Sequence, residues 1–375
     1  MKNNPVIVLG LGPAGLFITR QLSVVFKNIY AIGRLDDLGM YSRYIDKSKR
    51  YYAVNAEELE TAFRAIKERE HQIPELFICS DQYLSILIEE KSRWNGLFKL
   101  SCSDFETLEL INDKNTINEY CRKQGVRIPE SVSFTAYKEK MFFPAIIKWV
   151  EKRIETAVNP IGKVKICRNM DDFKTIEEAI VKGGIGEDEL FVQNYIEGRN
   201  DNQYSFGGVF SNGELLADVI VNQIKQYPQG ISAEVVSVYE GNICDELRKI
   251  SCGFAKELGF SGFLEMEYKY DSVSGEVFLL DVNPRPWGWV SILGTVYSDF
   301  YKVFEVRKPE NCNRDVIWKS PIRILLSQKN KQNVGFDKRQ NKYLVAYDIK
   351  NNKDKKPSFA ISIMAIKKIL KRVKK

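Results

Sequence analysis

Two short stretches late in the chain place oxygen-bearing side chains on segments that otherwise look like buried strands. The stretches are GFLEMEYKYD and EVFLLDVN, joined by the turn sequence SVSG. Side chains alternate between the two faces of a strand, so Glu265 and Glu267 share one face, and Leu279, Asp281 and Asn283 share a face of the other strand. Pairing the strands as a hairpin brings Glu267 close to Asp281 and Asn283.

Carboxylate and amide oxygens in this arrangement suit Mg²⁺, a hard cation that often shares its coordination shell with the phosphates of a substrate. We therefore predict that Glu267, Asp281 and Asn283 bind Mg²⁺, with Mn²⁺ as the alternative ion. Arg285 follows between two prolines and would meet a phosphate. Glu265 alone is better interpreted as an ordinary solvent-facing carboxylate on an edge strand.

A glycine loop near the start of the chain offers another nucleotide site. Gly10, Gly12 and Gly15 lie between an apolar strand and a helix, as in dinucleotide-binding loops. The second strand of such a site normally ends in an acid that holds the ribose, whereas YAIGRLDD has Gly33 and Arg34 there. Arg34 suits a 2′-phosphate, so an NADP or flavin oxidoreductase stays open as an alternative. We favour a turn that closes a Rossmann-like fold or cradles a carboxylate substrate.

The elements that must position these residues follow a two-part order. Residues 1–106 alternate strands and helices, as in NPVIVLGLGPAGLFITRQL followed by NIYAIG, and predict an α/β domain with a parallel sheet. The segment LELINDKNTINEYCRKQG predicts one helix, ended by Gly125 and Pro129. Strand-rich sequence then continues to about residue 310, and residues 311–375 form a polar extension with a basic end.

Composition restricts the chemistry. The 375 residues include a single histidine, His71, and seven cysteines without a Cys-x-x-Cys pair. These counts disfavour a catalytic histidine relay, a zinc site and a disulfide framework. No apolar run reaches about 18 residues, and the start lacks the pattern of a signal peptide, so we expect a cytoplasmic protein.

The net charge of +7 is concentrated at the end of the chain. Residues 352–375 hold nine Lys or Arg and one Asp, so the rest is close to neutral and we expect no nucleic-acid partner. Wound as a helix, residues 358–375 place Phe359, Ile363 and Leu370 on one side and lysines on the other. Such a helix can lie on an anionic membrane or dock on the protein itself, and the sequence leaves both open.

Taken together, these motifs resemble the ATP-grasp superfamily, and more closely its carboxylate–amine ligases of the D-aspartate-ligase type. The metal-binding end of these enzymes has an acid on one strand and Glu or Asp, x, Asn, Pro, Arg on the next, with Glu more usual than the Asp281 found here. The resemblance runs from the glycine loop to about Gly294. Its other motifs, in order, are MYSRY (40–44), CSDQYL (79–84), NDK (112–114), FPAIIK (143–148), FVQNYIEG (191–198) and QIKQYPQGIS (223–232).

The resemblance implies a fold and a reaction. The fold combines α/β and α+β parts: a Rossmann-like N-terminal domain (1–106), then a two-lobed ATP-grasp domain (107–310, smaller lobe about 130–195). With ATP and Mg²⁺, a small-molecule carboxylate would become an acyl phosphate, and an amine would attack it to form an amide, releasing ADP and phosphate. Catalysis would rest on positioning and charge neutralisation, without a histidine. A carboxylase and a nucleotide-binding protein without turnover stay open.

The resemblance also implies which residues bind ATP. Lys114 and Lys148 would meet the α- and β-phosphates as compact positive charges. Main-chain groups of Asn194 and Ile196 would bind adenine, and Gln193 would reach its amino group.

Other roles concern the ribose, the transferred phosphate and the substrates. Asp201 would accept from the ribose hydroxyls, while Arg285 and Lys225 would contact the transferred phosphate or the acyl phosphate. The family's phosphate-covering loop is often glycine-rich, but residues 149–162 contain one glycine, and Lys163 would supply a charge after it. Substrate residues are expected around the glycine loop, MYSRY and Asp81.

Overall fold

The computed structural model describes residues 1–150, 164–198, 200–329 and 343–360. Its N-terminal part is a five-stranded parallel sheet in the order β3-β2-β1-β4-β5. The strands are β1 (Val6–Leu9), β2 (Ile29–Gly33), β3 (Arg50–Tyr52), β4 (Glu75–Ile78) and β5 (Lys99–Leu100). The central strands are continuous apolar runs because a parallel sheet is buried on both faces.

Three helices cover this sheet. They are α1 (Pro13–Val25), α2 (Ala56–Glu70) and α3 (Asp81–Glu89). Helix α1 packs on the face that carries Val6 and Val8. Helices α2 and α3 pack on the opposite face, which carries Ile7 and Leu9. The alternation predicted from the sequence is therefore present.

The single helix predicted after the first domain is instead two helices, α4 (Phe105–Asn112) and α5 (Lys114–Lys123). Asp113 separates them, and its side chain accepts a hydrogen bond from the Thr116 amide at 2.7 Å. Aspartate is favoured at such a position because its carboxylate satisfies an amide that the helix leaves unpaired. The break makes Lys114 the first residue of α5.

The largest sheet has seven strands in the order β14-β13-β10-β11-β12-β15-β16, antiparallel except between β15 and β16. Its strands are β10 (Gln203–Ser211), β11 (Glu214–Gln226), β12 (Ser232–Val238), β13 (Gly262–Asp271), β14 (Glu276–Asn283), β15 (Val316–Lys319) and β16 (Leu344–Tyr347). Helix α8 (Asn242–Glu257) covers one face through Leu247 and Phe254. Helix α10 (Pro321–Lys329) follows β15. Two strands of this sheet thus come from beyond residue 310.

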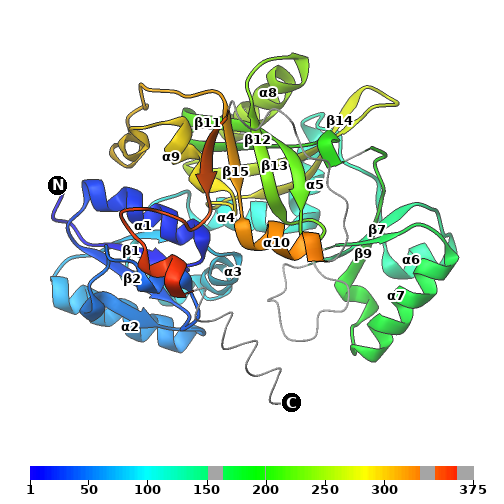
Figure 1. Cartoon of the computed structure of the whole chain (residues 1–375). Helices are drawn as coiled ribbons and strands as arrows, with labels where there is room; N and C mark the ends of the chain where they lie inside the picture. The colour runs from blue at the N-terminus through cyan, green and yellow to red at the C-terminus, as the bar shows by residue number, and fades with distance from the viewer. Residues whose placement is uncertain (151–163, 199, 330–342, 361–375) are drawn as a thin grey trace.

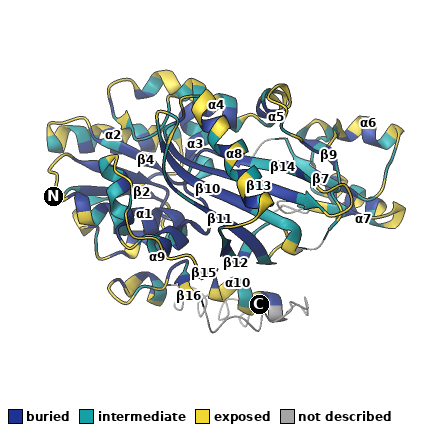
Figure 2. Cartoon of the chain, turned by 90° about the horizontal axis from the view of Figure 1, so that it is seen from above, coloured by how far each residue is buried: buried dark blue, intermediate teal, exposed yellow. Residues whose placement is uncertain are grey.

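A third, four-stranded sheet lies at the other end of the molecule from the N-terminal sheet (Figures 1 and 2). Its order is β6-β9-β7-β8, with β6 (Ser131–Ser133), β7 (Ala145–Trp149), β8 (Val164–Cys167) and β9 (Leu190–Asn194). Helices α6 (Phe134–Glu139) and α7 (Met170–Lys182) complete a separate small core. Figure 2 shows burial concentrated on the strands, with exposed residues along the outer helices.

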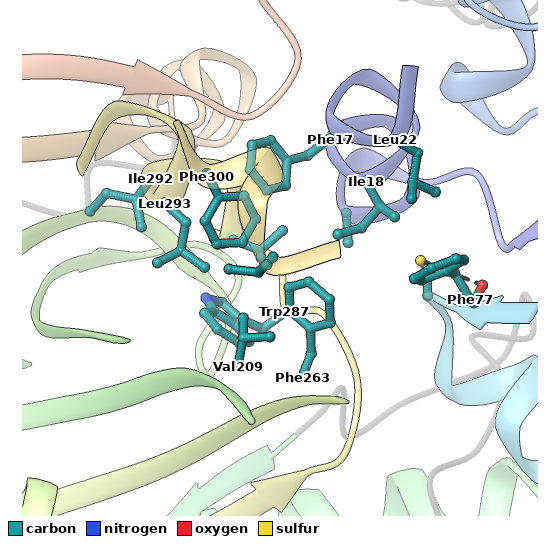
Figure 3. Packing of buried hydrophobic residues seen from close by; sticks show 14 of the residues in the cluster. Phe17, Ile18, Leu22, Phe77, Val209, Phe263, Trp287, Ile292, Leu293 and Phe300 are labelled. Carbon is teal, nitrogen blue, oxygen red and sulfur yellow. Dashed lines mark hydrogen bonds between the residues drawn. The ribbon is translucent and has the colours of Figure 1, made fainter. Parts of the chain in front are cut away.

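One apolar core joins the N-terminal sheet to the seven-stranded sheet (Figure 3). Phe17 of α1 and Phe77 of β4 belong to it, together with Trp287 and Phe300. Gly207 on β10 makes room for the indole, because a Cβ there would lie 2.1 Å from the Trp287 ring. The short helix α9 (Leu293–Val296) packs on the same core. The two sheets are therefore held together beside the end of β14.

This architecture confirms the predicted fold class, which combines α/β and α+β parts. Within the described residues, no helix has both the length and the apolar character needed to cross a membrane.

Candidate active site

A cavity of about 340 Å³ lies between the four-stranded and seven-stranded sheets. One part of its lining is apolar and comes from Ile146, Val164, Ile166, Phe191 and Leu280. The rest is polar and charged, with Asp81, Lys114, Lys148, Gln203, Glu267, Lys269, Asp281, Asn283 and Arg285. A slot with apolar walls and a charged end suits a flat ring that carries anionic groups.

The hairpin of β13 and β14 brings the predicted metal ligands together. Glu267 lies directly opposite Asp281, and Glu265 lies opposite Asn283, so the predicted proximity is confirmed. No group of three or more His, Cys, Asp or Glu suited to a metal occurs in the described part of the chain. Two carboxylates and an amide fit Mg²⁺ when substrate phosphates or water supply its remaining oxygen ligands.

A β-bulge changes the faces of β14. The register shifts after Glu267, so that Leu279 lies opposite Tyr268 while Asp281 stays opposite Glu267. Leu279 packs in the core beneath α8. The prediction that Leu279 shares the face of Asp281 is therefore wrong, because the extra residue resets the alternation.

Glu265 is buried, with 5% of its surface exposed. Its carboxylate accepts hydrogen bonds from Asn283 Nδ2 at 3.1 Å and from Trp289 Nε1 at 2.8 Å. The prediction of a solvent-facing carboxylate on an edge strand is wrong, because β13 lies between β10 and β14 and the Asn283 and Trp289 side chains contact the carboxylate. Since the amide nitrogen of Asn283 points to Glu265, Oδ1 is the Asn283 atom suited to a cation.

Side-chain amides connect Glu267 to the turn at 227–231. Gln203 Nε2 donates to Glu267 Oε2 at 3.4 Å, and Gln226 Nε2 donates to Gln203 Oε1 at 2.9 Å. The Gly230 amide donates to Gln226 Oε1 at 3.0 Å. An ionised carboxylate can only accept, so the direction of the whole relay is set at Glu267.

We expect Gln203→Leu to weaken metal binding without unfolding the protein. Residues that orient a metal ligand typically change affinity about 10–100-fold when they are replaced. Mn²⁺ binding to nucleotide-loaded protein, followed by electron paramagnetic resonance, measures the effect. Gln229→Leu is the control, because Gln229 lies at the far end of the relay and donates to Gln226. Equal Mn²⁺ affinity in both variants and the wild type would contradict this role for Gln203.

Both lysines assigned to phosphate binding line the cavity. Lys114 Nζ forms an ion pair with Asp281 Oδ1. Lys148 Nζ donates to Oε1 of the buried Gln193 at 2.7 Å. A phosphate would compete with Asp281 for Lys114, so the charge of this lysine can be shared between the carboxylate and a ligand.

Of the residues predicted to bind the nucleoside, some line the cavity and one does not. Asn194 and Ile196 line the cavity, and the Asn194 amide donates to the Glu130 carbonyl at 2.9 Å. Asp201 does not line it, and its own carbonyl accepts from Asn222 at 2.5 Å.

Two further predicted residues are not among the described residues that line the cavity. Lys225 is buried beside Glu234, with Nζ 3.7 Å from Oε2, and would have to leave this carboxylate to reach a phosphate. Lys163 and almost all of the loop at 149–162 lie outside the described residues.

Sequence reasoning missed Lys269, Gln203 and Gln226 in the lining. Lys269 lies two residues beyond Glu267 on the same face of β13, and its Nζ donates to the Gly198 carbonyl at 3.1 Å. Burial lowers the pKa of Lys269, against the opposing effect of the Asp201 charge. Strand alternation from Glu267 would have found Lys269, whereas the two glutamines carry no distinguishing pattern.

Arg285 is held by a residue of the N-terminal domain. Its Nε donates to Asp81 Oδ1 at 2.6 Å, its Nη2 pairs with Asp81 Oδ2, and its Nη1 donates to the Pro286 carbonyl at 2.8 Å. Burial is the largest single effect and acts to lower the pKa of Arg285, but the charge and hydrogen bond of Asp81, together with the charges of Glu265 and Glu267, raise the pKa overall. This two-point contact fixes both side chains where the N-terminal domain meets the cavity.

The Asp37 carboxylate binds main-chain amides at the glycine loop. Asp37 Oδ2 accepts from the main-chain amides of Leu11 and Arg34, each at 3.0 Å. Burial raises the pKa of Asp37, although these two hydrogen bonds favour its ionised form. At Gly15, a Cβ would lie 2.0 Å from the Gly10 carbonyl oxygen, so this glycine serves close packing.

We therefore expect no dinucleotide to bind the glycine loop. The Leu11 amide of this loop already bonds the Asp37 carboxylate, and a pyrophosphate would have to displace it. Isothermal titration with NAD, NADP and FAD should give no binding heat under conditions in which Mg-ATP binds. Micromolar NADP binding that disappears in Arg34→Ala would reverse this interpretation.

Comparisons with known proteins agree with the fold. No family profile matches the sequence. The chain is 21% identical over 245 residues to D-aspartate ligase from Enterococcus faecium, an alignment that spans 60% of this chain and 57% of that enzyme. The matched part of the relative is thus well under two thirds of its length.

Solved structures resemble almost the whole chain. Carboxyaminoimidazole ribonucleotide synthase from Aspergillus clavatus, complexed with ATP, has a TM-score of 0.64 at 11% identity and covers 84% of this chain and 81% of its own. The biotin carboxylase domain of Hydrogenobacter thermophilus 2-oxoglutarate carboxylase, in complex with MgADP and bicarbonate, has a TM-score of 0.61 at 13% identity, covering 84% and 74%. Both are ATP-grasp proteins. The chain has the ATP-grasp fold.

Proposed function

We propose that the protein is an ATP-dependent ligase that joins a small-molecule carboxylate to an amine through an acyl phosphate, releasing ADP and phosphate. The observation that carries this proposal is the convergence of Glu267, Asp281, Lys114, Lys148 and Arg285 on one cavity. Opposed carboxylates and several cations in one slot are what phosphoryl transfer requires. The sequence similarity to D-aspartate ligase supports amide formation as the reaction class.

In this proposal the apolar part of the cavity holds adenine. The Asn194 carbonyl accepts from the amino group of the base and the Ile196 amide donates to its ring, since the Asn194 amide is already bonded to Glu130. Gln193 holds Lys148 at the start of the phosphate chain, and Lys163, which lies outside the described residues, would supply a further charge. Asp201 takes the ribose hydroxyls only if its side chain moves to the cavity, which it does not line.

The charged part holds the phosphates and the reacting carboxylate. Glu267, Asp281 and Asn283 would hold Mg²⁺ or Mn²⁺, which neutralises phosphate charge when bound. Lys114 and Lys148 neutralise the remaining charge, and Arg285 contacts the transferred phosphate. Lys225 assists only if it exchanges Glu234 for a phosphate. Water is scarce in such a slot, so each of these interactions is stronger than in bulk solvent.

The test is ADP release from purified protein against panels of carboxylates and amines, with D-aspartate as the first acid and bicarbonate included. Hydroxylamine should intercept the acyl phosphate and yield a hydroxamate that depends on ATP, Mg²⁺ and the correct acid. Cleavage of ATP to AMP and pyrophosphate, or turnover without hydroxamate for every active acid, would overturn the proposal. Bicarbonate as the sole active acid would assign a carboxylase instead.

We also propose that this cytoplasmic enzyme touches anionic membranes through residues 358–375. Residues 361–375 lie outside the described part, so the proposal rests on the basic amphipathic sequence. Sedimentation with phosphatidylserine vesicles should pellet the full chain but not a chain ending at Lys356. Equal pelleting of the two would exclude this contact.

A further inference from the structure

We propose that Asp81 binds the amine substrate in its ammonium form and takes the proton that the amine loses as the amide forms. This inference rests on the proposed ligase function and assigns the amine subsite within it.

The position of Asp81 is built into the fold. It is the first residue of α3, three residues after the end of β4, and it lines the cavity. Phe77 of β4 and Trp287, two residues after Arg285, belong to the same apolar core (Figure 3). This core fixes the Asp81 carboxylate against the Arg285 guanidinium, so both groups stay at one edge of the cavity.

The other carboxylates are committed elsewhere. Among the described residues, the acids that line the cavity are Asp81, Glu267 and Asp281. The last two face each other across the hairpin and are assigned to the metal. Asp81 approaches from the N-terminal domain, and 31% of its side chain is exposed although Arg285 holds it. A ligand in the cavity can therefore reach the exposed part of this carboxylate.

An amide-forming enzyme needs such a group because primary amines are protonated near neutral pH, and an ammonium nitrogen has no lone pair for attack. The only histidine, His71, is exposed at the end of α2 and does not line the cavity. A fixed carboxylate next to the phosphate-binding arginine both attracts the ammonium and places it beside the acyl phosphate. Positioned acid–base groups of this kind contribute about 10²–10⁴ in rate.

The step balances without another reactant. The ammonium gives one proton to the Asp81 carboxylate, which passes it to solvent. The nitrogen lone pair forms the C–N bond, the bond between the acyl carbon and the phosphate oxygen breaks, and the phosphate leaves with that electron pair. The second proton of the nitrogen goes to the phosphate, giving a neutral amide and hydrogen phosphate.

The proposed binding of the amine by Asp81 can be distinguished from acyl phosphate formation by comparing two nucleophiles of nearly equal size. Near neutral pH hydroxylamine is neutral, whereas methylamine is a cation. With the acid found in the panel, Asp81→Asn should lose about 10²-fold or more of methylamide formation beyond any loss of hydroxamate formation, because both products share acyl phosphate formation and the contact with Arg285. Methylamide formation by this variant should recover as the pH rises and free amine accumulates, a change that a structural defect would not produce.

Two further variants serve as controls. Asp81→Glu keeps the charge and should retain part of the methylamide rate. Asp171→Asn removes an exposed carboxylate from the first turn of α7, away from the cavity, and should leave both products unchanged. Thermal unfolding of each variant checks that the fold is retained.

The remaining outcomes would contradict either the role of Asp81 or the ligase function. Equal loss of both products in Asp81→Asn would mean that Asp81 only holds Arg285, and unchanged methylamide formation would mean that it does not bind the amine; either overturns the proposal. A wild type that uses hydroxylamine but neither methylamine nor ammonium also overturns it. A wild type that forms no hydroxamate with any acid that stimulates ATP turnover would instead refute the ligase function itself.

Discussion

Mg²⁺-dependent ATP turnover is expected to fall about 10²–10³-fold in Glu267→Gln and in Asp281→Asn, equivalent to about 3–4 kcal/mol of transition-state stabilisation. Each change replaces one charged oxygen of the facing pair on β13 and β14 with an amide nitrogen that cannot bind a cation. Asp281→Asn also removes the ion pair with Lys114. Steady-state ADP release, measured across a range of Mg²⁺ concentrations, gives the size of both effects.

The matched control for these variants is Glu276→Gln. Glu276 begins β14 but pairs with Arg127 at the protein surface, with Oε1 2.8 Å from Nη2. This variant should keep wild-type turnover, and thermal unfolding should show all three variants folded. Wild-type rates in both Glu267→Gln and Asp281→Asn would remove the metal assignment.

Hydroxamate formation should be lost in Lys148→Met. The thioether side chain keeps much of the apolar stem of lysine but lacks the ammonium, which donates to Gln193 and faces the cavity. The charge neutralises phosphate in a slot where little water screens it, so its removal acts on the chemical step more than on folding. We expect a loss of about 10²-fold or more, by analogy with the removal of one stabilising donor from an active site.

Lys165→Met provides the comparison, because Lys165 lies on β8 of the same sheet with its side chain exposed and outside the cavity lining. The Lys165→Met variant should form as much hydroxamate as the wild type. If Lys148→Met also formed hydroxamate at the wild-type rate while its melting temperature was unchanged, Lys148 would have no part in phosphate binding.

The sequence by itself determined those features that depend on local periodicity. Strand alternation and a short turn placed Glu267 opposite Asp281 without any knowledge of the rest of the chain. The apolar runs around the glycine loop likewise predicted the parallel N-terminal sheet. Local patterns work here because residues two apart lie on the same face wherever a strand is regular, as from Glu265 to Glu267 on β13.

The tertiary structure decided where separate segments meet. A bulge moved Leu279 to the opposite face, and Trp289, 24 residues further along the chain, contacts the buried Glu265 carboxylate. Asp37 closed the glycine loop, although nothing in its neighbourhood marks it as an internal ligand.

The pairing of Asp81 with Arg285 is the clearest case. These residues are 204 positions apart, and no motif relates them. They meet because Phe77 and Trp287, each close to one of them in sequence, are buried in one core between two sheets. Contacts of this kind depend on how apolar surfaces fit together, which is a property of the folded chain and not of any single segment.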